Sequence, residues 1–249
     1  MRSLTLLALP LVMVACQAPP ANNTSQSANA AVQDTAPHQA VALTPTQKAG
    51  ETTFHTVCWS CHGNDGRGDG PAVQAGVVTA PPNFQTGGYA NLTQAELEQR
   101  FQASLQGGND PKHPHMKYVV SLLKPAKFDE ALAFIPALAY PPEIPGSAIN
   151  GQRIFQFRCA PCHGKNGEGD GPAAASLVTL APANFTKDTL IAKKDWQGVY
   201  NRIKEGGKSV HGSAMPTWGV ILKDSDIWDL VAYLATFQPG LLSKPSWEK

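Results

Sequence analysis

The sequence lacks the features of several protein classes. Its 249 residues include 20 basic and 19 acidic side chains, and a formal net charge of +1 gives no reason to expect nucleic-acid binding. Beyond the N-terminal residues no run of 18 apolar residues occurs, so no internal membrane helix can be read. Glycine and proline, 22 and 21 residues, stay below the level of disordered or collagen-like chains. One large or two small globular domains are therefore expected.

The N-terminal residues indicate export. Arg2 precedes an apolar run of eleven residues, Leu4 to Val14, which is too short to cross a bilayer. The segment from Met13 to Cys16 (MVAC) resembles a bacterial lipobox, in which a peptidase cuts before an acylated cysteine. Plain secretion with cleavage after Ala18 is the alternative. We therefore expect an exported chain, lipidated on Cys16 in the first interpretation.

The resemblance to lipoproteins divides the N-terminal region in two. It implies a signal peptide over residues 1–15, followed by a segment, residues 16–43, rich in Ala, Asn, Gln, Ser, Thr and Pro. Such a composition cannot bury enough apolar surface to fold, and as a flexible coil it would reach about 30 Å. Gln17 after the cysteine resembles an outer-membrane signal of Gram-negative lipoproteins. The expected location is the cell envelope, membrane-anchored through lipid and facing the periplasm.

Beyond this tether the sequence repeats itself. The segments CWSCHGNDGRGDGPA, from Cys58, and CAPCHGKNGEGDGPA, from Cys159, are identical at 10 of 15 positions with an offset of 101 residues. An offset of 99 residues matches Met116 to Met215. Two copies do not make a solenoid, so they predict tandem domains. The predicted boundaries are domain 1 at 44–140, a Pro-rich linker at 141–147, domain 2 at 148–240 and a C-terminal tail at 241–249.

The local patterns predict an all-α fold with long Gly/Pro-rich loops. Thr44 and Pro45 predict the start of a helix that ends near Cys58, and Asn150 predicts the start of its counterpart. Apolar residues at helical spacing predict a helix over 224–237, matched by a shorter one over 129–135. The four prolines between residues 136 and 147 predict a semi-stiff linker without helix.

Two cysteine motifs carry the chemistry. Each has the form C-x-x-C-H, which is the attachment pattern of c-type haem. Two thiols three residues apart on a helical turn can bond the two vinyl groups of one porphyrin, and the following imidazole then lies over the iron. A zinc site is disfavoured because 97 residues separate the pairs, and a thioredoxin-like site because no strands are visible. The predicted residues are Cys58, Cys61 and His62 for one haem, and Cys159, Cys162 and His163 for the other.

The sixth iron ligand is predicted from the methionines. Beyond the signal peptide the chain has two, Met116 and Met215, which lie 54 and 52 residues after the motif histidines. Methionine raises the potential of cytochromes c, although methionine also fills gaps in cores. For the first haem, His113, His115 or an open position are alternatives to Met116. His211, near Met215, is expected to be a loop residue.

These residues resemble class I cytochrome c, duplicated as a diheme protein. The resemblance implies that a glycine and an aromatic residue of the N-terminal helix cross an aromatic residue of the C-terminal helix. It also implies that the carbonyl groups of Pro71 and Pro172 orient the two histidines, while a tight turn is the alternative for these GDGP loops. The expected crossings are Gly50 and Phe54 with Phe134, and Gly151 and Phe155 with Tyr233. Asn83–Phe84, Asn184–Phe185 and Trp218 are expected either to wall the haems or simply to pack.

The function expected from these features is electron transfer in a bacterial respiratory chain, without a catalysed reaction or small-molecule substrate. The partners would be a redox donor and a redox acceptor, and a fixed subunit of a larger oxidase or dehydrogenase is the alternative. A diheme enzyme, such as a thiosulfate dehydrogenase or a peroxidase, would need an open or differently ligated iron. Residues 147–249 carry a net charge of +3 against −2 for residues 44–146, so basic residues of the second half could steer an acidic partner. Those residues are Lys187, Lys193, Lys194, Arg202, Lys204 and Lys208.

Overall fold

The structure is a computed structural model that describes residues 42–86, 88–106, 114–177, 180–209 and 212–245. Within these ranges the chain is helical and contains no strand, which confirms the predicted all-α class. The helices of the first repeat are α1 (Pro45–Thr53), α2 (Trp59–His62), α3 (Pro71–Gln74), α4 (Gln94–Gln106), α5 (Pro114–Leu122) and α6 (Pro125–Leu138). Those of the second are α7 (Ala148–Arg158), α8 (Ala160–His163), α9 (Thr189–Ala192), α10 (Trp196–Glu205) and α11 (Asp224–Ala235). None of the helices in these ranges is long and apolar enough to cross a membrane.

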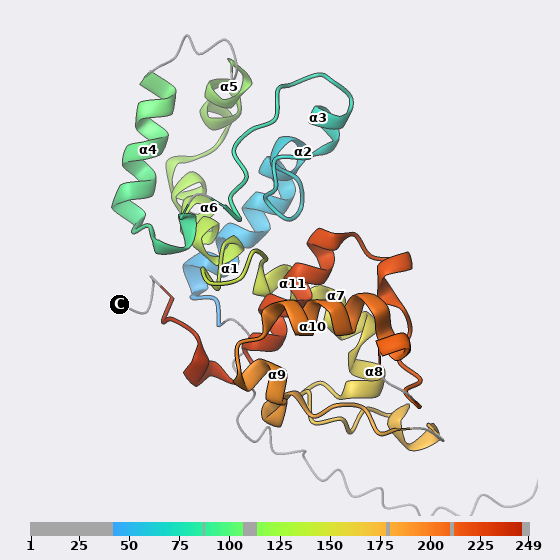
Figure 1. Ribbon diagram of the computed structural model, residues 1–249. Coiled ribbons are helices and arrows are strands. Elements are labelled where there is room, and N and C mark those ends of the chain that lie inside the picture. The colour runs from blue at the N-terminus through green and yellow to red at the C-terminus, as the bar shows by residue number, and fades with distance from the viewer. Residues whose placement is uncertain (1–41, 87, 107–113, 178–179, 210–211, 246–249) are drawn as a thin grey trace, which may run out of the picture. The chain divides into compact units, whose positions relative to one another are not determined.

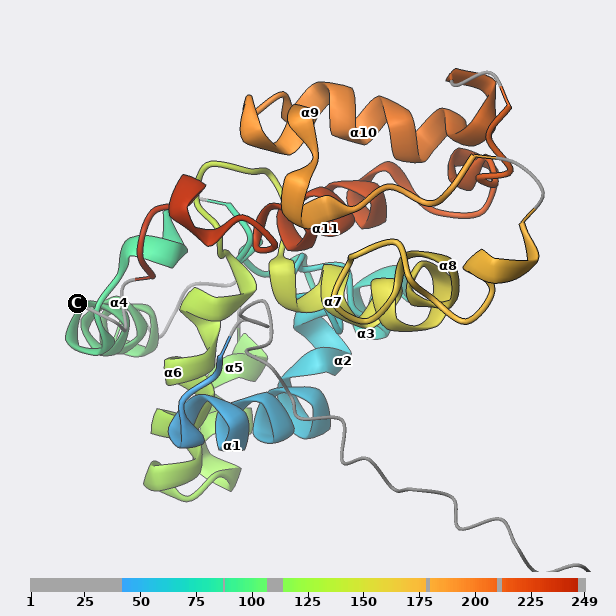
Figure 2. The ribbon, with the colours of Figure 1, turned by 90° about the horizontal axis from the view of Figure 1, so that it is seen from below.

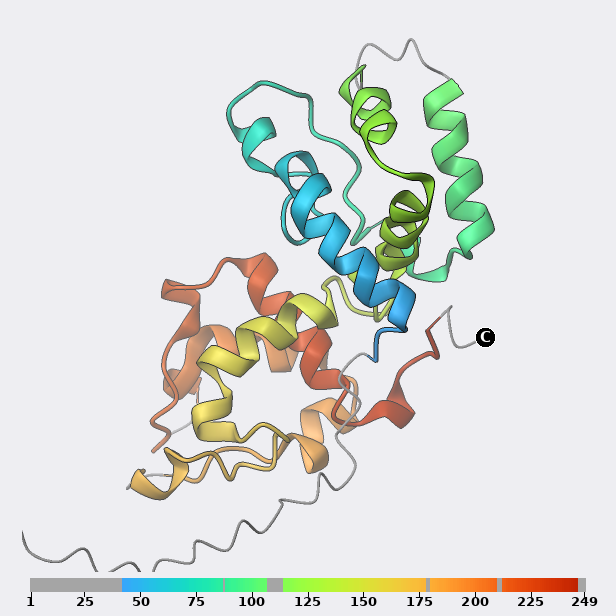
Figure 3. The same ribbon diagram turned by 180° about the vertical axis from the view of Figure 1, so that it is seen from behind.

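The first domain is built on the packing of α1 against α6, which Figure 3 shows as the blue helix beside the yellow-green one. Thr44 caps α1 through a capping box with Gln47, as predicted from the sequence. A Cβ atom at Gly50 would collide with the backbone of α6, so only glycine lets the two helices approach this closely. The rings of Phe54 and Phe134 lie 5.7 Å apart and both are buried. The crossing implied by the family resemblance is present.

The second domain repeats this crossing with α7 and α11, which lie side by side in Figures 1 and 2. Gly151 lies against the backbone of α11, where no side chain would fit. The rings of Phe155 and Tyr233 lie 5.2 Å apart in an edge-on arrangement. One prediction here is wrong: α7 begins at Ala148 rather than at Asn150, which lies buried within its first turn.

The connection between the domains is more helical and more buried than its prolines predict. Helix α6 continues through Pro136 and ends at Leu138, because a proline in the last turn interrupts few helical hydrogen bonds. Ile144 and Ser147 of the following segment are buried. The C-terminal residues pack on this segment: the Ser243 N–H donates to Glu143 Oε1 at 2.8 Å. The linker is therefore part of the packed structure.

Three helices occupy segments that were expected to be loops, namely α4, α5 and α10. In α10 the buried side chains are Val199, Tyr200 and Ile203, so one face of the helix packs on the second core. The spacing of Val199 and Ile203 is helical, but the short segment is otherwise polar. These helices fill the sequence between each cysteine motif and the C-terminal helix of its domain.

Candidate haem-binding sites

The first cysteine motif lies where the N-terminal helix of domain 1 changes its winding. A π-helical turn, Phe54–Cys58, joins α1 to α2. The two thiols of this motif are half-buried and free of any disulfide, and His62 is buried. Gly63 ends the helix with a φ of 76°, a left-handed conformation that favours glycine. Both thiols and the imidazole are thereby held on consecutive helical turns.

The second motif ends in the same way, although α7 leads to it without a π-helical turn. Cys159 and Cys162 are half-buried and free, and α8 ends at His163. Gly164 ends this helix with a φ of 77°, and its N–H donates to the carbonyl of Ala160 at 2.8 Å. The two repeats therefore present the same set of donor groups in the same backbone framework.

A phenylalanine stacks on each motif histidine. The rings of His62 and Phe84 are 4.6 Å apart with an interplanar angle of 13°. The rings of His163 and Phe185 are 4.5 Å apart with an angle of 20°. The asparagines before them form local turns, since each Oδ1 accepts a hydrogen bond from the backbone N–H two residues on. Both phenylalanines pack against an imidazole ring in this structure, and their role as haem walls stays a prediction.

The hydrogen bond that orients His163 differs from the expected one. Its Nδ1 lies 3.1 Å from the carbonyl oxygen of Ala183, between Pro182 and Asn184, rather than pairing with Pro172. A backbone carbonyl at Nδ1 fixes the ring and leaves Nε2 to bind a metal. For the second domain this role therefore passes from Pro172 to Ala183, while the role of Pro71 in the first domain stays a prediction.

The GDGP loops hold the ends of the motif helices. In the first domain the N–H groups of Gly68 and Gly70 donate to the carbonyls of His62 and Cys61, at 2.8 and 3.0 Å. In the second, Gly169 and Gly171 bond His163 and Cys162 at 2.9 and 3.1 Å. Gly68 has a left-handed φ of 78°, whereas Gly70 leaves no room for a Cβ atom against the motif backbone. The turn considered for this loop is present and positions the motif through backbone contacts.

Burial sets the electrostatics of both motifs. It raises the pKa of Cys58 to about 11 and that of Cys159 to about 12, with the second thiol of each motif adding to the shift. Burial lowers the pKa of His163, although the hydrogen bond to Ala183 opposes this. A lowered pKa favours the neutral imidazole, which is the form that binds a metal. The thiols of Cys58 and Cys159 are therefore protonated at neutral pH in the protein without haem.

The two methionines lie in different local structures. Met215 lies in an extended loop, half-buried against the same core cluster as Cys159 and Trp218. Its carbonyl accepts a hydrogen bond from the N–H of Gly207 at 2.7 Å, and its N–H donates to Ser213 Oγ at 3.2 Å. Met116 lies in α5 and is also half-buried. The repeat-equivalent methionines thus belong to a loop in one domain and to a helix in the other.

Several predicted residues fall outside the described part of the chain. They are Cys16, His113 and His211, together with the side chain of His115.

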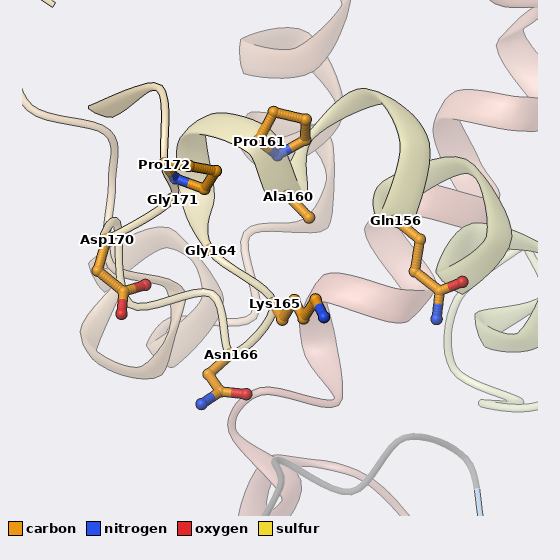
Figure 4. A pocket seen from close by; sticks show the side chains of 9 residues that line it. All are labelled: Gln156, Ala160, Pro161, Gly164, Lys165, Asn166, Asp170, Gly171 and Pro172. Carbon is orange, nitrogen blue, oxygen red and sulfur yellow. The ribbon is translucent and has the colours of Figure 1, made fainter. Parts of the chain in front are cut away.

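An open hollow of about 430 Å³ borders the second motif (Figure 4). Its lining includes Ala160 and Pro161, the two residues between the cysteines, but neither the cysteines nor His163. The hollow is therefore distinct from the place where the donor groups gather. Its other lining residues are Gln156, Gly164, Lys165, Asn166, Asp170, Gly171 and Pro172.

The donor groups fit a covalently held haem. Each domain offers two half-buried free thiols, a following imidazole ordered by aromatic stacking, and a half-buried thioether. A structural zinc site needs four ligands around one ion. In the described residues Cys58 and Cys159, one from each pair, pack against separate core clusters. The composition of each site matches the ligation of c-type haem by histidine and methionine.

Comparison with known proteins gives one family and several relatives. The model of the family "Cytochrome c" matches residues 47–139 and 148–238. The chain is similar to cbb3-type cytochrome c oxidase subunit CcoP of Rhodobacter capsulatus, with 28% identity over 71% of this chain and 54% of that protein. It is similar to subunit FixP of the same oxidase type in Azorhizobium caulinodans, with 27% identity over 77% of this chain and 59% of that protein.

A relative of another kind is the thiosulfate dehydrogenase of Stutzerimonas stutzeri, with 25% identity over 71% of this chain and 58% of that protein. The chain spans little more than half the length of these curated relatives. The matched segments of the family model cover both cysteine motifs and both helix crossings.

Proposed function

Because this chain belongs to the cytochrome c family, with two such domains in tandem, we propose that it is a diheme electron-transfer protein of a bacterial respiratory chain. The observation that carries the proposal is the repeated site: two C-x-x-C-H motifs in one backbone framework, each histidine stacked on a phenylalanine. The relatives among cbb3-type oxidase subunits support the respiratory setting.

Each residue of the site has one task in this function. Cys58 and Cys61 hold the first haem through thioether bonds, and His62 binds its iron; Cys159, Cys162 and His163 do the same for the second. When bound, haem supplies a one-electron couple of ferrous and ferric iron. The chain restrains the imidazole rings, and the burial around each motif keeps water away. Met116 and Met215 would supply the further ligand to each iron, and a thioether ligand raises the potential.

A closed iron makes the protein a carrier rather than an enzyme. The similarity to a thiosulfate dehydrogenase keeps one enzymatic alternative open, and it concerns the first haem, where Met116 lies in α5. The test is carbon monoxide binding to the purified ferrous protein, followed by visible absorption. We expect no spectral shift in wild type and stoichiometric binding at one haem in Met215→Leu. Carbon monoxide binding to one haem of the wild type would contradict two closed sites and favour an enzyme.

The two forms of the electron-transfer function differ in their partners. A mobile carrier docks transiently with a donor and an acceptor, whereas a subunit stays bound to one complex. The oxidase relatives favour the subunit, since they are named as parts of such a complex. Purification from membranes in mild detergent tests this: a stable haem–copper oxidase activity in the same fraction indicates a subunit, and a free diheme protein indicates a carrier.

We place the protein at the periplasmic face of a membrane, held by lipid on Cys16. The sequence at residues 13–16 and the polar tether behind it support this location, with Gln17 favouring the outer membrane. Replacement of Cys16 by serine should release the protein into the soluble periplasmic fraction with both haems attached. A Cys16→Ser variant that remains on the membrane would contradict the lipid anchor.

A further inference from the structure

Comparison of the two copies distinguishes residues that both haem sites share from residues that only one copy has. Positions identical in both copies include the cysteines, histidines and glycines of the two sites. Arg67 differs from its counterpart, which is Glu168 at the offset of 101 residues. Asp229 is fully buried in α11, whereas its counterpart at the offset of 99 residues, Glu130, is half-buried and pairs with Lys127. Haem binding therefore does not explain Arg67 and Asp229.

Arg67 reaches from the first haem-binding loop into the second domain. Its side chain is 12% exposed, and its Nη1 lies 2.8 Å from Asp65 of its own loop and 3.4 Å from Asp226 of α11. Its Nη2 donates to the carbonyl of Ser225 at 3.1 Å and to Asp229 Oδ2. The three carboxylates lie within 4.8 Å of one another, and the guanidinium group supplies the cation between them.

Asp229 joins this contact to the rest of the second domain. Its other oxygen, Oδ1, accepts a hydrogen bond of 2.7 Å from the N–H of Ser147, where the linker enters α7. Its backbone carbonyl lies against Gly151, at the crossing of α7 and α11. One buried carboxylate thus connects the linker and the core of domain 2 with the loop that follows the first C-x-x-C-H motif.

A second contact between the domains is more exposed. The Arg153 guanidinium in α7 lies 2.8 Å from Glu51 and 3.2 Å from His55 Nε2, both in the N-terminal helical segment of domain 1. At the offset of 101 residues Arg153 corresponds to Thr52, and Glu51 corresponds to Gln152. Threonine and glutamine carry no charge, so the equivalent ion pair cannot form. Both contacts therefore distinguish the two copies, and both connect them.

We propose that Arg67 and Asp229 form an interdomain ion pair that positions the first haem-binding loop against the second domain, so that electrons pass between the haems at a fixed separation. The inference rests on the proposed function, and both are positioning residues that belong to neither predicted set of haem ligands. A buried ion pair contributes little to stability on balance, but breaking it leaves an unpaired buried charge, so its best-supported role is to specify one arrangement. The fork of arginine suits several acceptors at once better than a lysine ammonium does.

The experiment uses the full-length protein with both haems and compares Arg67→Gln, Arg67→Lys and Asp229→Asn with wild type. Lys127→Gln is the matched control, because it removes an exposed ion pair with Glu130, the residue that corresponds to Asp229 in the first copy. All variants are measured at pH 8, where the Asp229 carboxyl group is ionised. The first readout is the rate at which an electron equilibrates between the haems after rapid reduction of a fraction of the molecules. The second is cleavage after Glu143 by a glutamate-specific protease. Ile144, the next residue, is buried and must leave the core before the linker can enter the protease.

We expect Arg67→Gln and Asp229→Asn to slow equilibration and to speed linker cleavage at least about tenfold, the factor that corresponds to 1.4 kcal/mol. Arg67→Lys should restore part of both effects, and Lys127→Gln should match wild type. If Arg67→Gln does not fold, the equilibration and cleavage rates of Arg67→Lys and Asp229→Asn still test the role of the ion pair.

Wild-type rates in all variants that retain two haems and the normal visible spectrum would overturn the ion pair as a positioning device while leaving the proposed function intact. The proposed function itself would fail if the wild-type haems could not exchange electrons or did not take them up reversibly.

Discussion

Replacing Gly151 by alanine tests whether the close crossing of α7 and α11 holds the second domain together. The added Cβ would collide with the carbonyl of Asp229 and lie 2.8 Å from the Cβ of Tyr233. The carbonyl of Asp229 belongs to the backbone of α11, so it cannot move away by a change of rotamer as a side chain could. The two helices would therefore have to separate along the face that carries Phe155 and Tyr233.

The expected loss follows from three terms. Overpacking a well-packed core costs about 1–3 kcal/mol, and the weakened contact between the Phe155 and Tyr233 rings removes up to about 1 kcal/mol more. The higher helix propensity of alanine returns about 1 kcal/mol. The variant should therefore be less stable by about 2 kcal/mol, which lowers the melting temperature of a domain of this size by about 8–16 °C.

The assay is thermal unfolding of the haem-loaded protein, followed by far-ultraviolet circular dichroism and by haem absorption. Gly240→Ala is the control, because no atom lies within 4 Å of a Cβ built there, and we expect no change beyond about 0.5 kcal/mol. Gly50→Ala should destabilise the first domain in the same way, since its Cβ would collide with the carbonyl of Glu130. A Gly151→Ala protein as stable as the Gly240→Ala control would refute the argument from helix contact.

Three further outcomes are expected. Met215→Leu should lower the potential of one haem and leave the other unchanged in a redox titration, because the thioether ligand raises the potential; an unchanged pair of potentials would remove Met215 from the ligand set. Replacing Cys159 and Cys162 together by serine should halve the haem that stays with the denatured polypeptide, and retention of both haems would contradict covalent attachment there. Burial raises the pKa of Asp229 to about 7, although Arg67 opposes this, so the carboxylate that pairs with Arg67 is fully formed only above that pH. Between about pH 4 and 7 the folded protein keeps a proton that the unfolded chain has released, so the free energy of unfolding falls as pH rises. Urea titrations across this range should show a smaller fall in Asp229→Asn, and equal slopes in the two proteins would show that Asp229 is not the group responsible.

The features that the sequence predicts well are local or repeated. The cysteine motifs have a fixed spacing, and the two copies identify each other's equivalent residues. The glycines and aromatic residues of the helix crossings recur at offsets of 101 residues for the N-terminal helix and 99 for the C-terminal helix. The cap at Thr44 has a local signature as well. Such signals survive in a single sequence because each is carried by residues a few positions apart or by an exact repetition.

The features that it predicts poorly depend on contacts distant in sequence. Arg67 and Asp229 are 162 residues apart, and neither has a local pattern that identifies its partner. The start of α7 at Ala148 is likewise tied to Asp229 through the N–H of Ser147, so Asn150 alone is a misleading signal. The choice of Ala183 over Pro172 as the partner of His163 depends on how two loops fold beside one ring.

The stacking of His62 on Phe84 and of His163 on Phe185 has a consequence for the speed of electron exchange. A redox centre changes charge without breaking bonds, so its barrier is set by how far the surroundings must rearrange between the two oxidation states. An imidazole pressed flat against a buried ring, and held at Nδ1 in the second domain, has little freedom to turn when the charge on its partner changes. Preorganised polar groups of this kind act without a reorganisation cost at the moment of transfer. We therefore expect the two phenylalanines, which exchange no electron themselves, to keep the reorganisation energy of both centres low.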